Sequence, residues 1–241
     1  MSDRPPKAAM LIAQRIVQDV VRSGMRPGDL LPPERAMLAE YDAGRGTLRE
    51  ALRLLEFQGV ISLKPGPGGG PVVQSPPAEH LGSTLTLLMQ LNQAPYRVIV
   101  EVRAALEPMI SRLAAERIAA PALTELGTTI EAMRSDLDDR DAFLESNRRF
   151  HDVIARASGN VLFAYIVESL LGILDGTAIG IDYPRKRRVA ILKAHELILD
   201  ALRRADPEAA EAGMRAHIEA YNHYAQQHFP EVLEETITWA G

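Results

Sequence analysis

Three histidines in the second half of the chain could together bind a metal ion. His151 lies in ESNRRFHDVI, His195 in ILKAHELIL and His217 in GMRAHIEAY. Asn147 precedes His151 by four residues, so both side chains project from one face of a helix. Three imidazoles and an amide oxygen suit a divalent transition metal, with zinc or nickel favoured. The alternative is that each histidine is an ordinary core residue, because sequence spacing alone does not bring three helices together.

A second group of residues, between positions 45 and 53, could bind DNA. The segment RGTLREALRLLEF predicts a helix whose apolar positions are Leu48, Ala51, Leu52 and Leu55. Its other face carries Arg45 and Arg49, whose forked guanidinium groups match guanine O6 and N7, each pair contributing about 1–3 kcal/mol of discrimination. Thr47 and backbone N–H groups can fix the helix on phosphates. The alternative for any single arginine is a solvated helix face.

The elements around these arginines predict a winged helix-turn-helix. A first helix begins after Pro32 and Pro33 with an acidic residue, Glu34, which favours a helix N-terminus. Its expected buried side chains are Leu38, Ala39 and Tyr41. An Asp-Ala-Gly connection leads to the second helix, and an apolar strand with a glycine-rich tip follows. We therefore expect a DNA-binding domain over residues 1–75.

The remainder of the chain predicts helices almost throughout, broken at prolines or at a Gly-Asn pair. The expected helices span residues 79–92, 95–119, 121–138, 141–158, 160–179, 184–205 and 207–228. Seven helices with short connections predict an antiparallel bundle, whose core can hold a ligand or a metal. The fold class is thus mainly α, with a linker at 76–78, an effector domain at 79–230 and a C-terminal tail at 231–241.

Composition and charge narrow the class of protein. The 241 residues contain 46% hydrophobic residues and no cysteine, which excludes disulfides and thiolate metal sites. We see no signal peptide and no apolar segment that could span a membrane, so we expect a cytoplasmic protein. Residues 1–80 carry 10 Lys and Arg against 9 Asp and Glu, whereas the rest carries 17 against 23. This asymmetry suits a DNA-binding domain joined to an acidic sensor.

The N-terminal segments PGDLLPPER, RGTLREALRLLEFQGVI and GPGGGPVV resemble the DNA-binding domain of the GntR family of bacterial transcription regulators. This resemblance covers about the first 75 residues. It implies that Arg35, Arg45, Thr47 and Arg49 contact DNA, with the wing tip that begins at Gly66 approaching the minor groove. Two positions depart from the family pattern. Gly44 replaces a serine that would cap the second helix, and Pro71 removes a backbone donor from the wing.

The helical half resembles the FCD-type effector domain of the FadR subfamily. Its VanR-like members hold a metal with Asp or Asn, a His four residues later, and two more His on later helices. This resemblance implies Asn147, His151, His195 and His217 as metal ligands. It also implies that Arg103, in EVRAALEP, binds a ligand carboxylate. The alternative for Arg103 is a salt bridge to Glu107 or Glu101 on its own helix.

Together these observations predict a ligand-responsive transcription regulator rather than an enzyme. We expect a homodimer that binds a short palindromic operator in double-stranded DNA, without a membrane partner. A small organic acid bound at the metal would relieve repression. Two alternatives stay open: a metal-dependent hydrolase or lyase, and a metal sensor without an organic ligand. We find no catalytic residues and no nucleophile motif, which disfavours the enzyme.

Overall fold

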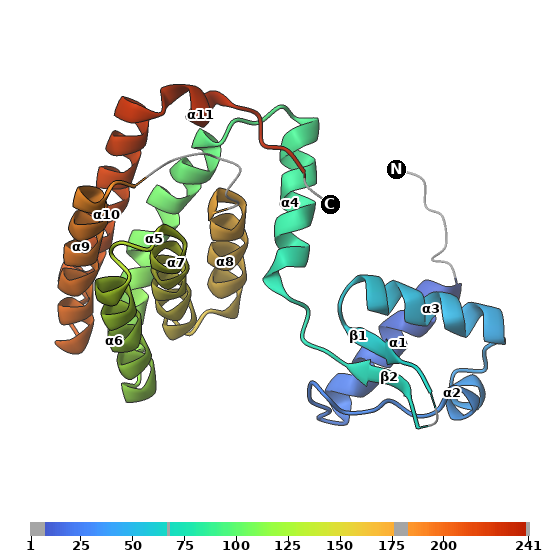
Figure 1. The fold of residues 1–241 in the computed structure, drawn as a ribbon. Coiled ribbons are helices and arrows are strands. Elements are labelled where there is room, and N and C mark those ends of the chain that lie inside the picture. Colours follow the sequence, from blue (N-terminus) through green and yellow to red (C-terminus); the bar gives the residue numbers. More distant parts are fainter. Residues whose placement is uncertain (1–7, 67, 176–182, 240–241) are drawn as a thin grey trace. The chain divides into compact units, whose positions relative to one another are not determined.

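A computed structural model describes residues 8–66, 68–175 and 183–239, and the chain forms two compact units, Met1–His80 and Leu81–Gly241. Figure 1 shows that helices make up most of both units. The expectation of a mainly α fold is confirmed. The boundary between the units lies inside a helix, α4, which spans Ala78–Leu91.

The first unit is a winged helix-turn-helix. Its elements are α1 (Ala8–Arg22), α2 (Glu34–Glu40), α3 (Arg45–Phe57), β1 (Ile61–Lys64) and β2 (Gly70–Val73). The two strands form an antiparallel hairpin in which Ile61 lies opposite Val73 and Lys64 lies opposite Gly70. The glycine-rich segment that closes this hairpin is the wing.

The core of the first unit confirms one predicted apolar face and corrects another. The apolar face of α3 is buried as expected: Leu48, Ala51, Leu52 and Leu55. On α2, however, Ala39 is exposed, and the fully buried residue is Met37. Met37 and Tyr41 are four residues apart and share the inner face of this short helix, whereas Ala39 lies about 200° around the helix from Met37.

Pro71 does not interrupt the hairpin, contrary to the expectation that it removes a donor from the ladder. It lies opposite Leu63, and its carbonyl accepts a hydrogen bond of 2.8 Å from the Leu31 N–H. Because the N–H and C=O of one strand residue point to the same side, the missing N–H of Pro71 would face Leu31 rather than β1. The proline therefore leaves the bonds between β1 and β2 intact.

The second unit is a helical bundle. Its helices are α4, α5 (Arg97–Arg117), α6 (Ala120–Ser135), α7 (Arg140–Ala157), α8 (Val161–Asp175), α9 (Arg185–Arg203), α10 (Pro207–His228) and α11 (Pro230–Glu234). The helices expected from the sequence are present in the predicted order. The last part of the one expected at 160–179 lies outside the described residues. Asp139 and Asp206 cap α7 and α10 by accepting hydrogen bonds from backbone N–H groups of the first turn.

The centre of the bundle is formed by α5, α7, α9 and α10. Helix α10 packs against both α5 and α9, and α7 packs against α5, α6 and α8. The largest fully buried side chains in this core include Phe143 and Phe150 on α7 and Ile110 on α5. The four helices thus surround a common interior, to which each contributes polar as well as apolar side chains.

The segment after α11, expected to be part of a C-terminal tail, packs against the N-terminal helix of the bundle. Ile237 is fully buried, and its N–H donates to the carbonyl of Ala94 at 3.0 Å. Trp239 donates from its indole Nε1 to Ser83 Oγ and from its backbone N–H to Gln90 Oε1, both at 2.7 Å. These bonds fasten the segment to α4. Among the described residues, no helix is long and apolar enough to cross a membrane.

Candidate metal centre and DNA-binding surface

The three predicted histidine ligands come together inside the second unit. His151 lies on α7, His195 on α9 and His217 on α10. One ring nitrogen from each lies within 4.8 Å of the others, and all three side chains are buried. His80, His223 and His228, which the sequence pattern left aside, are exposed.

Packing within the bundle fixes the rings of this cluster. The ring of Phe150 stacks on His195 with 4.1 Å between centroids and 8° between planes. His151 and His195 meet edge to face, with their centroids 5.2 Å apart. Because Phe150 and His151 are neighbours on α7, the same helix supplies one histidine and orients another.

Two of the nitrogen atoms lie at a separation that metal ligands adopt. Nε2 of His195 lies 3.2 Å from Nε2 of His217. Two nitrogens that each lie about 2.0–2.1 Å from one zinc ion are about 2.8–3.4 Å apart in octahedral or tetrahedral geometry. Nε2 of His151 is buried and makes no hydrogen bond to any residue that the structure describes. These residues therefore fit a metal ion, which would also satisfy the isolated nitrogen.

Electrostatics favour neutral imidazoles here, the form that donates a lone pair. Burial is the main cause that lowers the pKa of His195 and His217 well below the usual histidine value. The charge of Arg103 lowers both pKa values further. At neutral pH both rings are thus ready to bind a metal without first losing a proton.

Glu107 belongs to this site, although sequence reasoning named it only as an alternative partner for Arg103. Its Oε2 lies 2.5 Å from Nδ1 of His151, and its Oε1 accepts a hydrogen bond from Nε of Arg103. Both Arg103 and Glu107 are buried on α5. Burial acts to raise the pKa of Glu107, but Arg103 and His151 together hold it well below the usual range. The i, i+4 spacing of Arg103 and Glu107 was the sequence signal for this pair.

Asn147 and Arg103 are the other residues that the sequence predicts for this site. Asn147 lies one turn before His151 on α7 and is half-buried, and its role as a fourth ligand stays a prediction. Arg103 forms the salt bridge that was the alternative to ligand binding, and its guanidinium lies 5.8 Å from the centre of the Tyr221 ring.

The residues expected to contact DNA lie on the surface of the first unit. Arg35, Arg45 and Arg49 are exposed, and Thr47 is half-buried in the first turn of α3. Gly44 takes the N-cap position of α3 and provides no side-chain hydrogen bond. At the wing tip Gly66 has a φ of 95°, a left-handed conformation that glycine adopts without strain.

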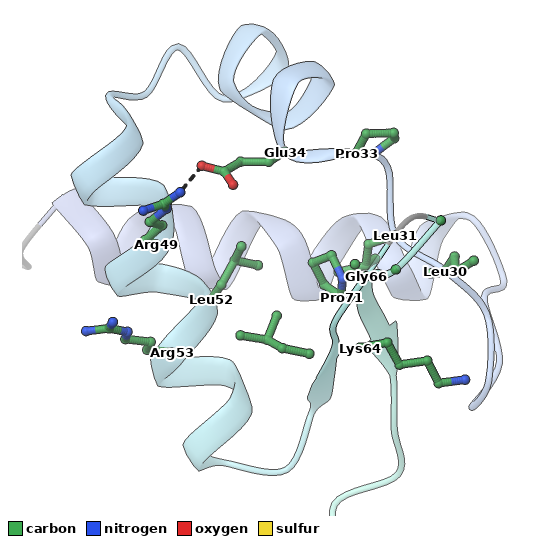
Figure 2. A pocket seen from close by; sticks show the side chains of 14 residues that line it. Leu30, Leu31, Pro33, Glu34, Arg49, Leu52, Arg53, Lys64, Gly66 and Pro71 are labelled. Carbon is green, nitrogen blue, oxygen red and sulfur yellow. Dashed lines mark hydrogen bonds and ion pairs between the residues drawn. The ribbon is translucent and has the colours of Figure 1, made fainter.

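A groove of about 760 Å³ lies between α3 and the wing (Figure 2). Its lining includes apolar side chains from several elements, with Leu52 from α3 and Pro71 from β2. Arg49, Arg53 and Lys64 contribute positive charge to it. Nε of Arg49 lies 3.3 Å from Oε1 of Glu34, as the dashed line in Figure 2 shows. The exposed helix face and the wing thus border one concave surface, which is largely apolar and carries more basic than acidic side chains.

Comparisons with known proteins agree with both halves of this description. Residues 9–69 match the bacterial regulatory proteins of the gntR family, and residues 98–220 match the FCD domain. The HTH-type transcriptional regulator YcbG of Bacillus subtilis is 30% identical over 87% of this chain and 86% of its own. The transcriptional repressor NanR of Salmonella newport is 26% identical over 88% of this chain and 83% of its own.

A solved structure supports the fold. The Streptococcus agalactiae GntR structure superposes with a TM-score of 0.71 at 24% identity, covering 90% of this chain and all of the other. The match to both families and to YcbG identifies a transcription regulator and not an enzyme. The chain belongs to the GntR family of bacterial regulatory proteins, as a DNA-binding transcription regulator with an FCD effector domain.

Proposed function

We propose that the protein represses transcription until a small carboxylate metabolite binds to a divalent metal ion inside its FCD domain. The single observation that carries this proposal is the buried convergence of His151, His195 and His217. Zinc or nickel suits three imidazole nitrogens. Asn147 would add a neutral oxygen ligand, leaving coordination positions for the metabolite.

The charges of the site explain why its ligand should be an anion. Arg103 and Glu107 neutralise each other, and the histidine rings at 195 and 217 favour the neutral form. A divalent cation would therefore add two positive charges to a buried site that offers no further negative ligand among these residues. Burying uncompensated charge is unfavourable, so an anionic ligand would bind strongly. A guanidinium nitrogen of Arg103 other than Nε, which bonds Glu107, would donate a hydrogen bond to a carboxylate beside the metal.

DNA binding would depend on α3 and the wing. Arg45 and Arg49 would bind bases in the major groove, Thr47 and Arg35 would contact the backbone, and the wing tip at Gly66 would approach the minor groove. A homodimer would place two such surfaces on a short palindromic operator. A metabolite would need only a few kcal/mol of differential affinity between DNA-competent and incompetent states to release the operator.

The test begins with protein from which metal has been removed. The protein would be reloaded with Zn²⁺ or Ni²⁺, and metal content would be measured by native mass spectrometry. Binding to DNA selected from random duplexes would then be measured with and without acetate, lactate, citrate and other small carboxylates.

Stoichiometric metal binding and a carboxylate that weakens DNA binding only in the metal-loaded protein would support the proposal. Metal binding without any carboxylate response across a broad panel would favour a metal sensor. Failure to bind any divalent transition metal would overturn the proposal.

A further inference from the structure

The buried side chains of α5 form a chain of contacts that ends at the metal cluster. Arg103 donates to Oε1 of Glu107, and Oε2 of the same carboxylate lies 2.5 Å from Nδ1 of His151. No more than 8% of any of these three side chains is exposed. One carboxylate thus connects a permanent cation with a metal-binding imidazole.

This contact determines which nitrogen of His151 faces the metal. A carboxylate oxygen can only accept a hydrogen bond, so Nδ1 of His151 must carry the proton. The lone pair of the neutral ring is then on Nε2, the buried nitrogen that lacks a hydrogen bond. The same hydrogen bond fixes the plane of the ring and increases the basicity of the ligating nitrogen.

Arg103 holds the carboxylate in position for this role. Its guanidinium Nε donates to Oε1 of Glu107, which leaves Oε2 directed at Nδ1 of His151.

We propose that Glu107, held by Arg103, is the positioning residue that orients His151 for metal binding. Glu107 does not bind the metal in this proposal and acts only through the imidazole. The proposal rests on the metal-dependent function proposed above, because it explains how one ligand of that metal is prepared.

The test compares metal affinity between full-length variants, measured by competition with a fluorescent zinc chelator in the absence of any carboxylate effector. Glu107→Gln removes the charge and should weaken Zn²⁺ binding about 10- to 100-fold, the usual effect of losing such a partner. Glu107→Asp keeps the charge on a shorter side chain and should recover part of the affinity. The matched control is Glu101→Gln, on the same helix, where Glu101 is exposed and pairs with Arg97.

A double variant separates orientation of His151 from stability of the fold. Glu107→Gln alone removes the charge that Nε of Arg103 contacts, and breaking a buried ion pair destabilises proteins in general. Arg103→Met combined with Glu107→Met removes both charges and should restore thermal stability toward that of the wild type. Its Zn²⁺ affinity should remain about 10- to 100-fold lower, because His151 still lacks its acceptor.

Cobalt spectra provide a readout that a purely structural role would not change. In the Co²⁺-loaded Glu107→Gln variant the visible absorption bands should shift relative to the wild type, while the Glu101→Gln spectrum should not change. Wild-type Zn²⁺ affinity in both Glu107→Gln and the double variant would overturn this inference and leave the metal-dependent function intact. A wild-type protein that binds no metal would instead refute the proposed function itself.

Discussion

The first unit carries its proposed functional arginines on the surface, whereas the second unit holds its polar cluster inside the hydrophobic core. Arg45 and Arg49 extend from α3 into solvent, and the exposed Arg49 pairs with Glu34 on its neighbouring helix. His195 is fully buried and stacks on Phe150. The proposed functional side chains are thus exposed in the first unit and buried in the second.

Exposed and buried polar groups differ in what their placement implies. An exposed ion pair contributes little to stability, so the side chain can exchange its partner for DNA. Buried polar groups are unfavourable unless they are paired, so an isolated buried nitrogen needs a partner such as a metal ion. The DNA-binding role of the first unit is therefore inferred from its sequence motif. The metal-binding role of the second unit is inferred from the burial and geometry of its histidines.

The largest expected effect is a loss of DNA binding by the first unit, with metal binding by the second unit unchanged. Arg45→Ala combined with Arg49→Ala should weaken operator binding by about 30-fold or more, because each arginine contributes about 1–3 kcal/mol of base recognition. Fluorescence anisotropy with labelled duplex would measure this. The metal content of the variant should equal that of the wild type. Unchanged DNA affinity would remove α3 from the proposed interface.

Metal should stabilise the second unit and leave the arginine surface unchanged. At a free Zn²⁺ concentration 100 times the dissociation constant, the folded protein should gain about 2.7 kcal/mol of stability. His195→Gln should abolish most of this gain, since it removes one of three nitrogen ligands. Thermal unfolding with and without Zn²⁺ would measure the difference. An equal metal-induced shift in the variant would show that the ion binds elsewhere.

The metal-free protein should lose stability as the pH falls below about 6.5. Burial lowers the pKa of His195 and His217, so below this pH the unfolded chain binds two protons that the folded protein excludes. Burial also raises the pKa of Asp152 to about 6, so the folded protein gains one proton there first, which opposes the effect. The net difference of about one proton corresponds to about 1.4 kcal/mol per pH unit just below pH 6.

Urea unfolding across this pH range would test the balance. In a variant that combines His195→Gln with His217→Gln, only the opposing contribution of Asp152 remains among these three groups. The dependence of stability on pH should then flatten or reverse. An unchanged slope would mean that the buried histidines are not the source of the pH dependence.

The smallest expected effects concern glycines of the first unit. Gly44, the N-cap of α3, has extended backbone with φ of −70°, and a Cβ there would meet no atom within 4 Å. Gly44→Ser should therefore stabilise the unit by a few tenths of a kcal/mol. Gly59 has a φ of +71°, and its Cβ would lie 2.8 Å from Cε1 of His80. Gly59→Ser should destabilise by about 1 kcal/mol or more, and chemical denaturation of both variants would measure the contrast.

The sequence predicted the fold well wherever apolar spacing and prolines were regular. The four apolar positions of α3 and the order of the bundle helices followed from these signals. Helix α1 was not predicted, although Ala9, Ile12, Ala13 and Ile16 repeat with helical spacing and are buried. The charged residues before this short apolar run concealed its period. The inner face of α2 was also misassigned, because two turns provide too few positions to determine a phase.

The candidate site was predicted only in part. Histidine spacing and family resemblance identified the three imidazoles, but their convergence depends on how α7, α9 and α10 pack, which sequence spacing does not determine. The contact between Glu107 and His151 joins residues 44 positions apart on different helices. A salt bridge within α5 could be expected from the i, i+4 rule, but a partner on another helix could not.

The indole and the backbone N–H of Trp239 both donate hydrogen bonds to side chains of α4. The chain contains a single tryptophan, so its intrinsic fluorescence arises mainly from this one position when excited near the red edge of the absorption band. Its indole is bonded to Ser83, just beyond the boundary between the two compact units. The wavelength of its emission maximum therefore reports, without any added dye, whether Trp239 stays hydrogen-bonded to α4 when metal or acid is titrated in.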